Sequence, residues 1–152
     1  MQVSDYTGQP ETQGGLVKTL DFKIYLGLLT ETYNEAHQAD LKRTAAVPID
    51  LVVVNLYPFE QTIAKPDCDL PTAIENIDIG GPTMLRAAAK NHAAVSVIVD
   101  AADYERVLTE MAGNYAKAGR YDRALQVALT IHNASFQANA LSEIARMYAE
   151  AG

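Results

Sequence analysis

The sequence has 152 residues, of which 49% are hydrophobic and 20% are charged, and its formal net charge is −7. This length suffices for one domain with a buried core, and the lack of a basic stripe excludes a typical nucleic-acid-binding protein. The apolar runs are too short to cross a bilayer, and a single cysteine allows no internal disulfide. His37, His92 and His132 have no ligand-like spacing to one another or to Cys68, so no metal site is expected. We therefore expect a cytoplasmic protein that binds neither nucleic acid nor membranes.

The first two thirds of the chain alternate helical and strand-like patterns. A polar helix is expected over Thr32–Thr44, followed by a β-branched run, Ile49–Leu56, which is typical of a strand buried on both faces. Segment 80–90 begins Gly-Gly-Pro and continues into an alanine-rich stretch, which predicts a helix because proline is favoured just inside a helix start. A second strand is expected over 94–99 and another helix over 103–117. The order strand, helix, strand predicts a right-handed parallel βαβ unit, so the fold class is α/β.

An internal repeat occupies the last third of the chain. The twelve residues Leu108–Gly119 align with Leu141–Gly152 at an offset of 33, and seven of the twelve positions are identical. In each copy the leucine, alanine and tyrosine positions fall on one helix face. Two alanine-rich helices could look alike by composition alone, but the shared Glu, Tyr and terminal Gly favour a repeat.

The spacing within residues 108–152 resembles a tetratricopeptide-type helical hairpin. The positions where that family places small and aromatic packing residues are occupied by Ala112, Tyr115, Gly119, Tyr121 and Ala124. The segment holds only one and a half such units, whereas helical repeats need about three to bury a continuous core. We therefore expect these helices to pack on the α/β part or on another chain.

The polar residues best suited to chemistry lie in the α/β part. Tyr57 follows the carboxyl end of the first expected strand, where open α/β sheets bind ligands. Asp78 precedes the Gly-Gly turn, which would offer backbone N–H groups to an anion at a helix start. With Lys18 and Lys90, this set suits proton transfer and stabilisation of an oxyanion. On the residues alone, structural roles are favoured instead: a turn carboxylate, an edge aromatic and solvated helix charges.

Four blocks of residues resemble the IMP cyclohydrolase domain of the bifunctional purine-biosynthesis protein. They are Val3–Gly8, Val17–Leu20, Pro48–Phe59 and Ala73–His92, of which the last two are long and in register. The resemblance covers residues 3–111. It implies a methylglyoxal-synthase-like α/β fold, here a partial doubly wound parallel sheet with a C-terminal α-helical extension. It also implies a homo-oligomer that closes formylated aminoimidazole carboxamide ribotide to IMP, with no metal or organic cofactor.

Carried over position by position, the resemblance also implies the roles of individual residues. Asp78 would accept a proton, Lys90 would stabilise the formyl oxygen during ring closure, and Lys18 and Tyr57 would orient the base of the purine ribotide. The residues implied in substrate binding are Thr19, Asn55, Gly80, Gly81 and Arg86.

The sequence departs from the family pattern near its start. The opening strand–helix–strand unit of the family, with its phosphate-gripping loop, has no counterpart, so we expect an N-terminally truncated domain. Leu16 replaces an anion-binding arginine, and Phe22, Tyr25 and Leu26 add apolar surface around the expected cleft. We therefore expect a cyclohydrolase-like part, residues 1–111, partly covered by the repeat-like helices of residues 112–152.

Three functions are considered, in order of preference. The first is a recombined or engineered chimera, a cyclohydrolase framework with little or no activity, because ring closure needs the ribotide held firmly. The second is an active IMP cyclohydrolase completed by oligomerisation. The third is a small helical binding module, which ranks last because so few repeats offer little groove.

Overall fold

The computed structural model describes residues 1–151, and the chain forms two compact units, residues 1–99 and residues 100–152. Helix α7, Tyr104–Lys117, runs without a break through the expected boundary between residues 111 and 112. The division therefore falls earlier, between Val99 and Asp100, because a continuous helix keeps its residues in one packing unit. That residues 112–152 pack on the α/β part stays a prediction.

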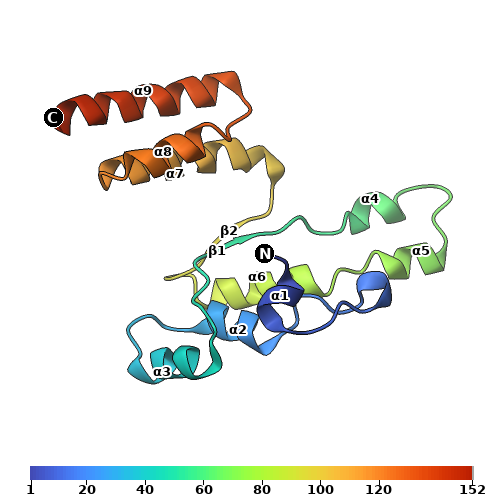
Figure 1. The fold of residues 1–152 in the computed structure, drawn as a ribbon. Coiled ribbons are helices and arrows are strands. Elements are labelled where there is room, and N and C mark those ends of the chain that lie inside the picture. The colour runs from blue at the N-terminus through green and yellow to red at the C-terminus, as the bar shows by residue number, and fades with distance from the viewer. Residues whose placement is uncertain (152) are drawn as a thin grey trace. The chain divides into compact units, whose positions relative to one another are not determined.

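The first unit is mostly helical, as Figure 1 shows. In chain order its helices and strands are α1 (Val3–Thr7), η1 (Gln13–Gly15), α2 (Phe22–Leu29), α3 (Glu35–Thr44), β1 (Leu51–Val53), α4 (Phe59–Ile63), α5 (Leu70–Glu75), α6 (Gly80–Lys90) and β2 (Ser96–Ile98). The helices predicted before the first strand and after Gly80 are thus confirmed, the former starting three residues later than expected because Asn34 caps it.

The sheet of this unit consists of β1 and β2, paired in parallel. Val52 lies opposite Val97, and α6 connects the two strands, so the predicted parallel βαβ unit is confirmed. Within the described residues this parallel sheet has two strands, where a partial doubly wound sheet was expected, and each strand is only three residues long. The expectation of strands buried on both faces is wrong, since Val53 and Val97 are 51% and 39% exposed. Each strand has one neighbour, which leaves an edge and part of a face open to solvent.

The core of the first unit lies where α2 and α6 pack together against the strands. Its buried members include Leu28 of α2, Val52 of β1 and Ala88 of α6. At the far end of α6, the Asn91 side-chain amide donates to the carbonyls of Leu28 (2.9 Å) and Thr30 (3.0 Å). This amide satisfies two carbonyls at the end of α2, where helices leave such groups unpaired, and fixes α2 to α6.

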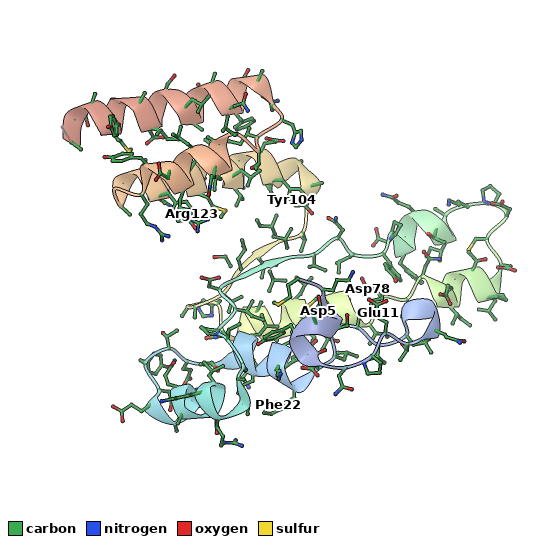
Figure 2. All side chains as sticks on the ribbon, in the orientation of Figure 1. Asp5, Glu11, Phe22, Asp78, Tyr104 and Arg123 are labelled. Atoms are coloured by element: carbon green, nitrogen blue, oxygen red, sulfur yellow. The ribbon has the colours of Figure 1, made fainter. Side chains whose placement is uncertain are left out.

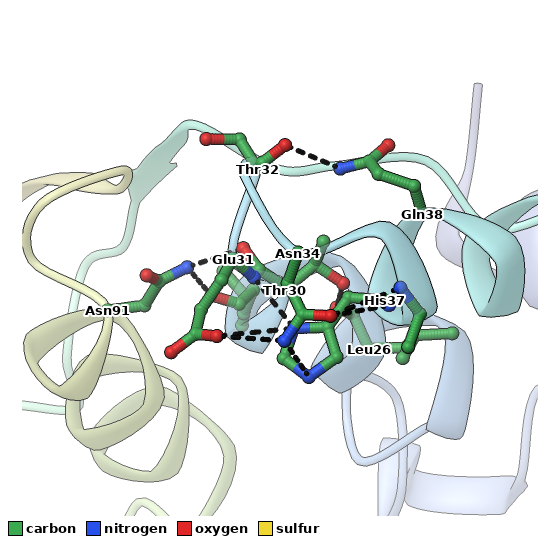
Figure 3. Close-up of polar contacts among 10 residues, drawn as sticks. Leu26, Thr30, Glu31, Thr32, Asn34, His37, Gln38 and Asn91 are labelled. Atoms are coloured by element: carbon green, nitrogen blue, oxygen red, sulfur yellow. Dashed lines mark hydrogen bonds and ion pairs between the residues drawn. The ribbon is translucent and has the colours of Figure 1, made fainter.

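A polar network closes the turn between α2 and α3, as shown in Figure 3. The side-chain oxygen Oδ1 of Asn34 accepts hydrogen bonds from the backbone N–H groups of Ala36 (3.1 Å) and His37 (3.3 Å), which caps α3. The Asn34 amide donates to the Glu31 carboxylate (3.2 Å), and the His37 ring lies 3.7 Å from that carboxylate. Hydrogen bonds from Asn34 and Tyr33 lower the pKa of Glu31, with a smaller contribution from the His37 charge.

Asn34→Asp is expected to raise the pKa of Glu31 while leaving α3 capped. An aspartate keeps the oxygen that caps the helix, but it removes the amide donor and adds a negative charge beside Glu31. Because folding lowers this pKa, the stabilising contribution of Glu31 is present at neutral pH and is lost as the pH falls through the folded value. An NMR titration of the Glu31 carboxyl measures the shift. Asn34→Ala removes the cap as well and should cost about 1 kcal/mol; an unchanged titration in Asn34→Asp would contradict the assignment.

The second unit is a bundle of three helices that follow η2 (Ala101–Asp103). They are α7, α8 (Tyr121–Ala128) and α9 (Ala134–Ala151). Their common core consists of small and aliphatic residues: Ala112, Ala116, Ala124, Ala128, Ile131, Ala140 and Ile144. Alanines allow helix backbones to approach closely. Gly119, with φ of +71°, ends the first helix and reverses the chain in a conformation that favours glycine.

The two copies of the repeat lie on different helices of this bundle, the first on α7 and the turn after it, and the described part of the second, residues 141–151, on α9. Four of the five residues expected at packing positions, Ala112, Tyr115, Tyr121 and Ala124, are in or against the core. No helix within residues 1–151 is long and apolar enough to span a membrane.

Candidate functional site

A cleft of about 330 Å³ lies between the loop before α2, the end of β1 and the start of α6. Six of the residues implied in catalysis or substrate binding line it: Lys18, Thr19, Tyr57, Asp78, Gly80 and Gly81. Figure 2 labels Asp78 near the start of α6. The volume is at the lower end of the range for small-molecule sites, about 300–1,000 Å³.

The Asp78 carboxylate is bound by backbone groups from two elements. One oxygen accepts from the N–H of Gly81 (2.9 Å) in the first turn of α6, and the other accepts from the N–H of Tyr57 (3.2 Å) after β1. The side chain therefore caps the helix and joins it to the strand exit. A carboxylate is favourable at this end of a helix because the macrodipole is positive there.

The start of α6 offers fewer free N–H groups to an anion than the sequence suggested. Among the first three helical residues, Pro82 has no N–H, and the N–H of Gly81 is bound by Asp78. The anion that the helix start attracts is therefore supplied by the chain itself. The sequence signal was ambiguous because the same Asp-x-Gly-Gly pattern suits a ligand site and a self-capped helix.

Glycine is required at Gly80, where the loop before α2 lies close to α6, and at Gly15 within that loop. A side chain at Gly80 would place its Cβ 2.8 Å from the Thr19 hydroxyl, and one at Gly15 would place it 2.6 Å from Lys18 Cε. Gly15 also has φ of +65°, which side-chain-bearing residues rarely adopt. Gly81 is equally confined, since a Cβ there would lie 2.8 Å from Asp78 Oδ2. These glycines are thus explained by side chains that lie close to their backbone and, at Gly15, by the positive φ, neither of which requires a ligand.

Arg86 and Lys90 lie outside this cleft. They line a second hollow, of about 500 Å³, together with Tyr25, Leu29 and Thr83. Lys90 is the last residue of α6, and Gly80 is the first. Because a helix rises about 1.5 Å per residue, the two ends lie about 15 Å apart along its axis. The expected pair of a proton acceptor and a formyl-oxygen stabiliser, Asp78 and Lys90, is therefore not brought together within the first unit. Asn55 does not line either hollow.

Tyr25 is a residue of the second hollow that the sequence marked only as a departure from the family pattern. Its hydroxyl oxygen is buried and has no hydrogen-bond partner among the described residues. The neighbouring Thr83 hydroxyl donates to the Ile79 carbonyl (2.6 Å). Burial raises the pKa of Tyr25. Tyr25 also packs against the core of the first unit, so it adds apolar surface to the contact between α2 and α6.

The mouth of the first cleft is apolar and open. Leu16 is 84% exposed, and Val17, Ile77 and Ile79 are each more than half exposed. Phe22, another of the departures, is 64% exposed. Such a mouth does not exclude water from Lys18 or Tyr57, both of which are exposed themselves. Among residues 1–151, no group of three His, Cys, Asp or Glu side chains is placed to hold a metal ion.

Comparison with known proteins identifies the first part of the chain. Residues 1–83 match the family described as MGS-like domain, which is more than half of the chain. A solved structure described as "Crystal structure of ForH" is similar at 30% sequence identity with a TM-score of 0.60, and the match covers 97% of this chain and 71% of that one. The family match and the small parallel sheet among helices both agree with an MGS-like fold. The chain therefore belongs to the MGS-like domain family.

Proposed function

We propose that the chain is a framework derived from IMP cyclohydrolase that retains little or no activity. Its cleft holds Lys18, Tyr57 and Asp78, three of the four residues that the resemblance assigns to catalysis. The single observation that carries the loss of activity is the position of the fourth, Lys90, in a separate hollow at the other end of α6. A stabilising charge contributes to catalysis only when it is placed beside the atom where charge develops.

Two further observations support this proposal. Both oxygens of Asp78 accept hydrogen bonds from the backbone, which holds the carboxylate in a capping position. Leu16, where the family has an anion-binding arginine, offers no charge to a phosphate group and is almost fully exposed. A ribotide would lack the contacts that fix it for ring closure.

We further propose that the chain is a recombined or engineered chimera with tetratricopeptide-like helices after its MGS-like part. The support is the repeat itself: Leu108, Ala112 and Tyr115 recur as Leu141, Ala145 and Tyr148 on a second helix of the same unit. The match to ForH covers 97% of this chain and therefore includes its helical unit. The proposal of a chimera thus rests on the repeated sequence of the helices, because a helical segment after the MGS-like part is common to both proteins.

The alternative is an active IMP cyclohydrolase completed by oligomerisation. The observation in its favour is that Arg86 and Lys90 are exposed and form no ion pair among the described residues. A second copy could bring its own Lys90 to the cleft of the first. Both proposals take a purine ribotide as ligand, and they differ in whether a homo-oligomer restores the site.

The first prediction of the proposal is that the full chain does not accelerate ring closure of the formylated ribotide above the spontaneous rate. Ultraviolet absorbance follows the formation of IMP, and the assay is run over a range of protein concentrations. Lys90→Ala is the matched variant, because Lys90 is exposed and its removal leaves the core intact. A rate that rises more steeply than the protein concentration and disappears in Lys90→Ala would establish the oligomeric alternative. A rate proportional to concentration and dependent on Lys90 would show that a single chain is active.

A further inference from the structure

The face by which α7 joins the core of the second unit is repeated on α9. On α7, Ala112 and Ala116 are 0% and 2% exposed, and Leu108 and Tyr115 pack against the same core. The residues 33 positions later are of identical type: Leu141, Ala145, Tyr148 and Ala149. The two helices therefore carry the same four side chains at the same helical spacing.

On α9 most of this face is open. Ala145 and Ala149 are exposed, Tyr148 is 66% exposed, and only Leu141 is partly buried. The side of α9 that is buried is a different one, centred on Ala140 and Ile144. Since successive residues of a helix turn by about 100°, Ala145 lies about 100° around the axis from Ile144. Leu141 connects the open face to the core, because it packs against the core at one edge.

The structure also shows what such a face contacts. Ala112 and Ala116 of α7 share one buried cluster with Ala124 and Ala128 of α8, which are both fully buried. Figure 1 shows α7, α8 and α9 side by side in this unit. The partner surface on α8 is thus a pair of alanines one turn apart, which lets two helices approach closely enough for their side chains to interlock.

A second contact adds specificity. The Arg120 guanidinium, just before α8, lies 5.1 Å from the centre of the Tyr115 ring. Tyr148 is the equivalent tyrosine on α9, and its ring is in edge contact with Tyr121 at 5.0 Å between centroids. That contact leaves 66% of the residue exposed. A helix preceded by an arginine could therefore use Tyr148 as Arg120 uses Tyr115.

We infer that the open face of α9, formed by Leu141, Ala145, Tyr148 and Ala149, is a docking surface for a short amphipathic helix with the chemistry of α8. The occupant presents alanines at positions i and i+4, with an arginine four residues before the first of them. This is an interaction surface independent of the cleft, and it holds whether or not ring closure occurs. Amphipathic helices commonly bind partner proteins through their apolar face.

The test uses the full chain and a fluorescently labelled synthetic peptide of residues 119–131, the α8 segment. Fluorescence anisotropy is expected to show saturable binding. Ala145→Arg should weaken it at least tenfold, because a charged side chain would have to be buried between the helices. Asn139→Arg is the matched control, since Asn139 is exposed on α9 and its replacement adds the same charge. A peptide with Ala124→Arg should not bind, and one with Arg120→Ala should bind more weakly.

Circular dichroism establishes that both protein variants remain folded; the exposure of Ala145 makes disruption of the bundle by Ala145→Arg unexpected. Absence of saturable binding, or equal binding by the Ala145→Arg and Asn139→Arg variants, would overturn the inference. A third outcome would also overturn it: the peptide fails to bind, while the chain self-associates and Ala145→Arg abolishes this self-association. The face would then belong to a dimer of two α9 helices.

Discussion

Replacing Leu28 by alanine is expected to destabilise the first unit by about 2–5 kcal/mol, because the substitution leaves a cavity in its core. Leu28 is 1% exposed and is the largest fully buried side chain among the described residues. It packs with Val52 of β1 and Ala88 of α6, so its loss weakens the contact of α2 with the strands and with α6. Urea unfolding followed by circular dichroism measures the change in the free energy of unfolding.

The neighbouring residue provides the control for Leu28→Ala. Leu29 has the same side chain but is 39% exposed. Leu29→Ala should therefore lower the free energy of unfolding much less, since less of this side chain is buried in the folded state. Because the chain has two compact units, unfolding need not be a single transition. Hydrogen exchange resolved by segment should show lower protection in α2 and α6 of the Leu28 variant and unchanged protection in α7–α9. Equal effects of the two substitutions would contradict the assigned core.

Enlarging Ala124 to leucine is expected to destabilise the helical unit by about 1–3 kcal/mol, through overpacking of a closely packed site. Ala124 is 0% exposed and lies in the core with Ala112 and Ile144. The added carbons have no room unless α7 and α8 move apart. Ala138→Leu is the matched control, because Ala138 is exposed on α9 and leucine is almost as good a helix former as alanine.

The expected exchange pattern of Ala124→Leu is the reverse of that for Leu28→Ala: protection falls in α7–α9 and is kept in α2 and α6. A variant as stable as the wild type would show that the bundle is loosely packed at this position. Such a result would also weaken the docking inference for α9, which relies on close contact between alanine faces.

Membership of the MGS-like family fixes the fold of the first part but not its chemistry, since one fold supports several activities. The matched region, residues 1–83, contains Lys18, Tyr57 and Asp78 but ends before Arg86 and Lys90. Two of the residues that the resemblance assigns to the site therefore lie beyond that match. The proposed loss of activity and the proposed docking face are tested by separate measurements on separate units.

The sequence by itself determined the features that local interactions control. The helix starting at Gly80 follows from the glycine and proline at its first turn, and the βαβ order follows from the two β-branched runs on either side of it. The helices of the second unit follow from the periodicity of their apolar residues. The resemblance in the first two thirds of the chain implied a methylglyoxal-synthase-like fold, which the match to the MGS-like family confirms. Each of these signals is contained within a few turns of chain or within one aligned block.

Only the tertiary structure decided which polar groups meet and which apolar faces are covered. The carboxylate of Asp78 caps α6 through the N–H of Gly81 and is also held by the N–H of Tyr57, 21 residues earlier in the chain. The strands are shorter and more exposed than their composition predicted, because burial of a strand depends on neighbours that its own sequence does not specify. For the same reason, two helices with nearly identical sequence differ in burial: α7 has α8 against its alanine face, while the equivalent face of α9 is left open.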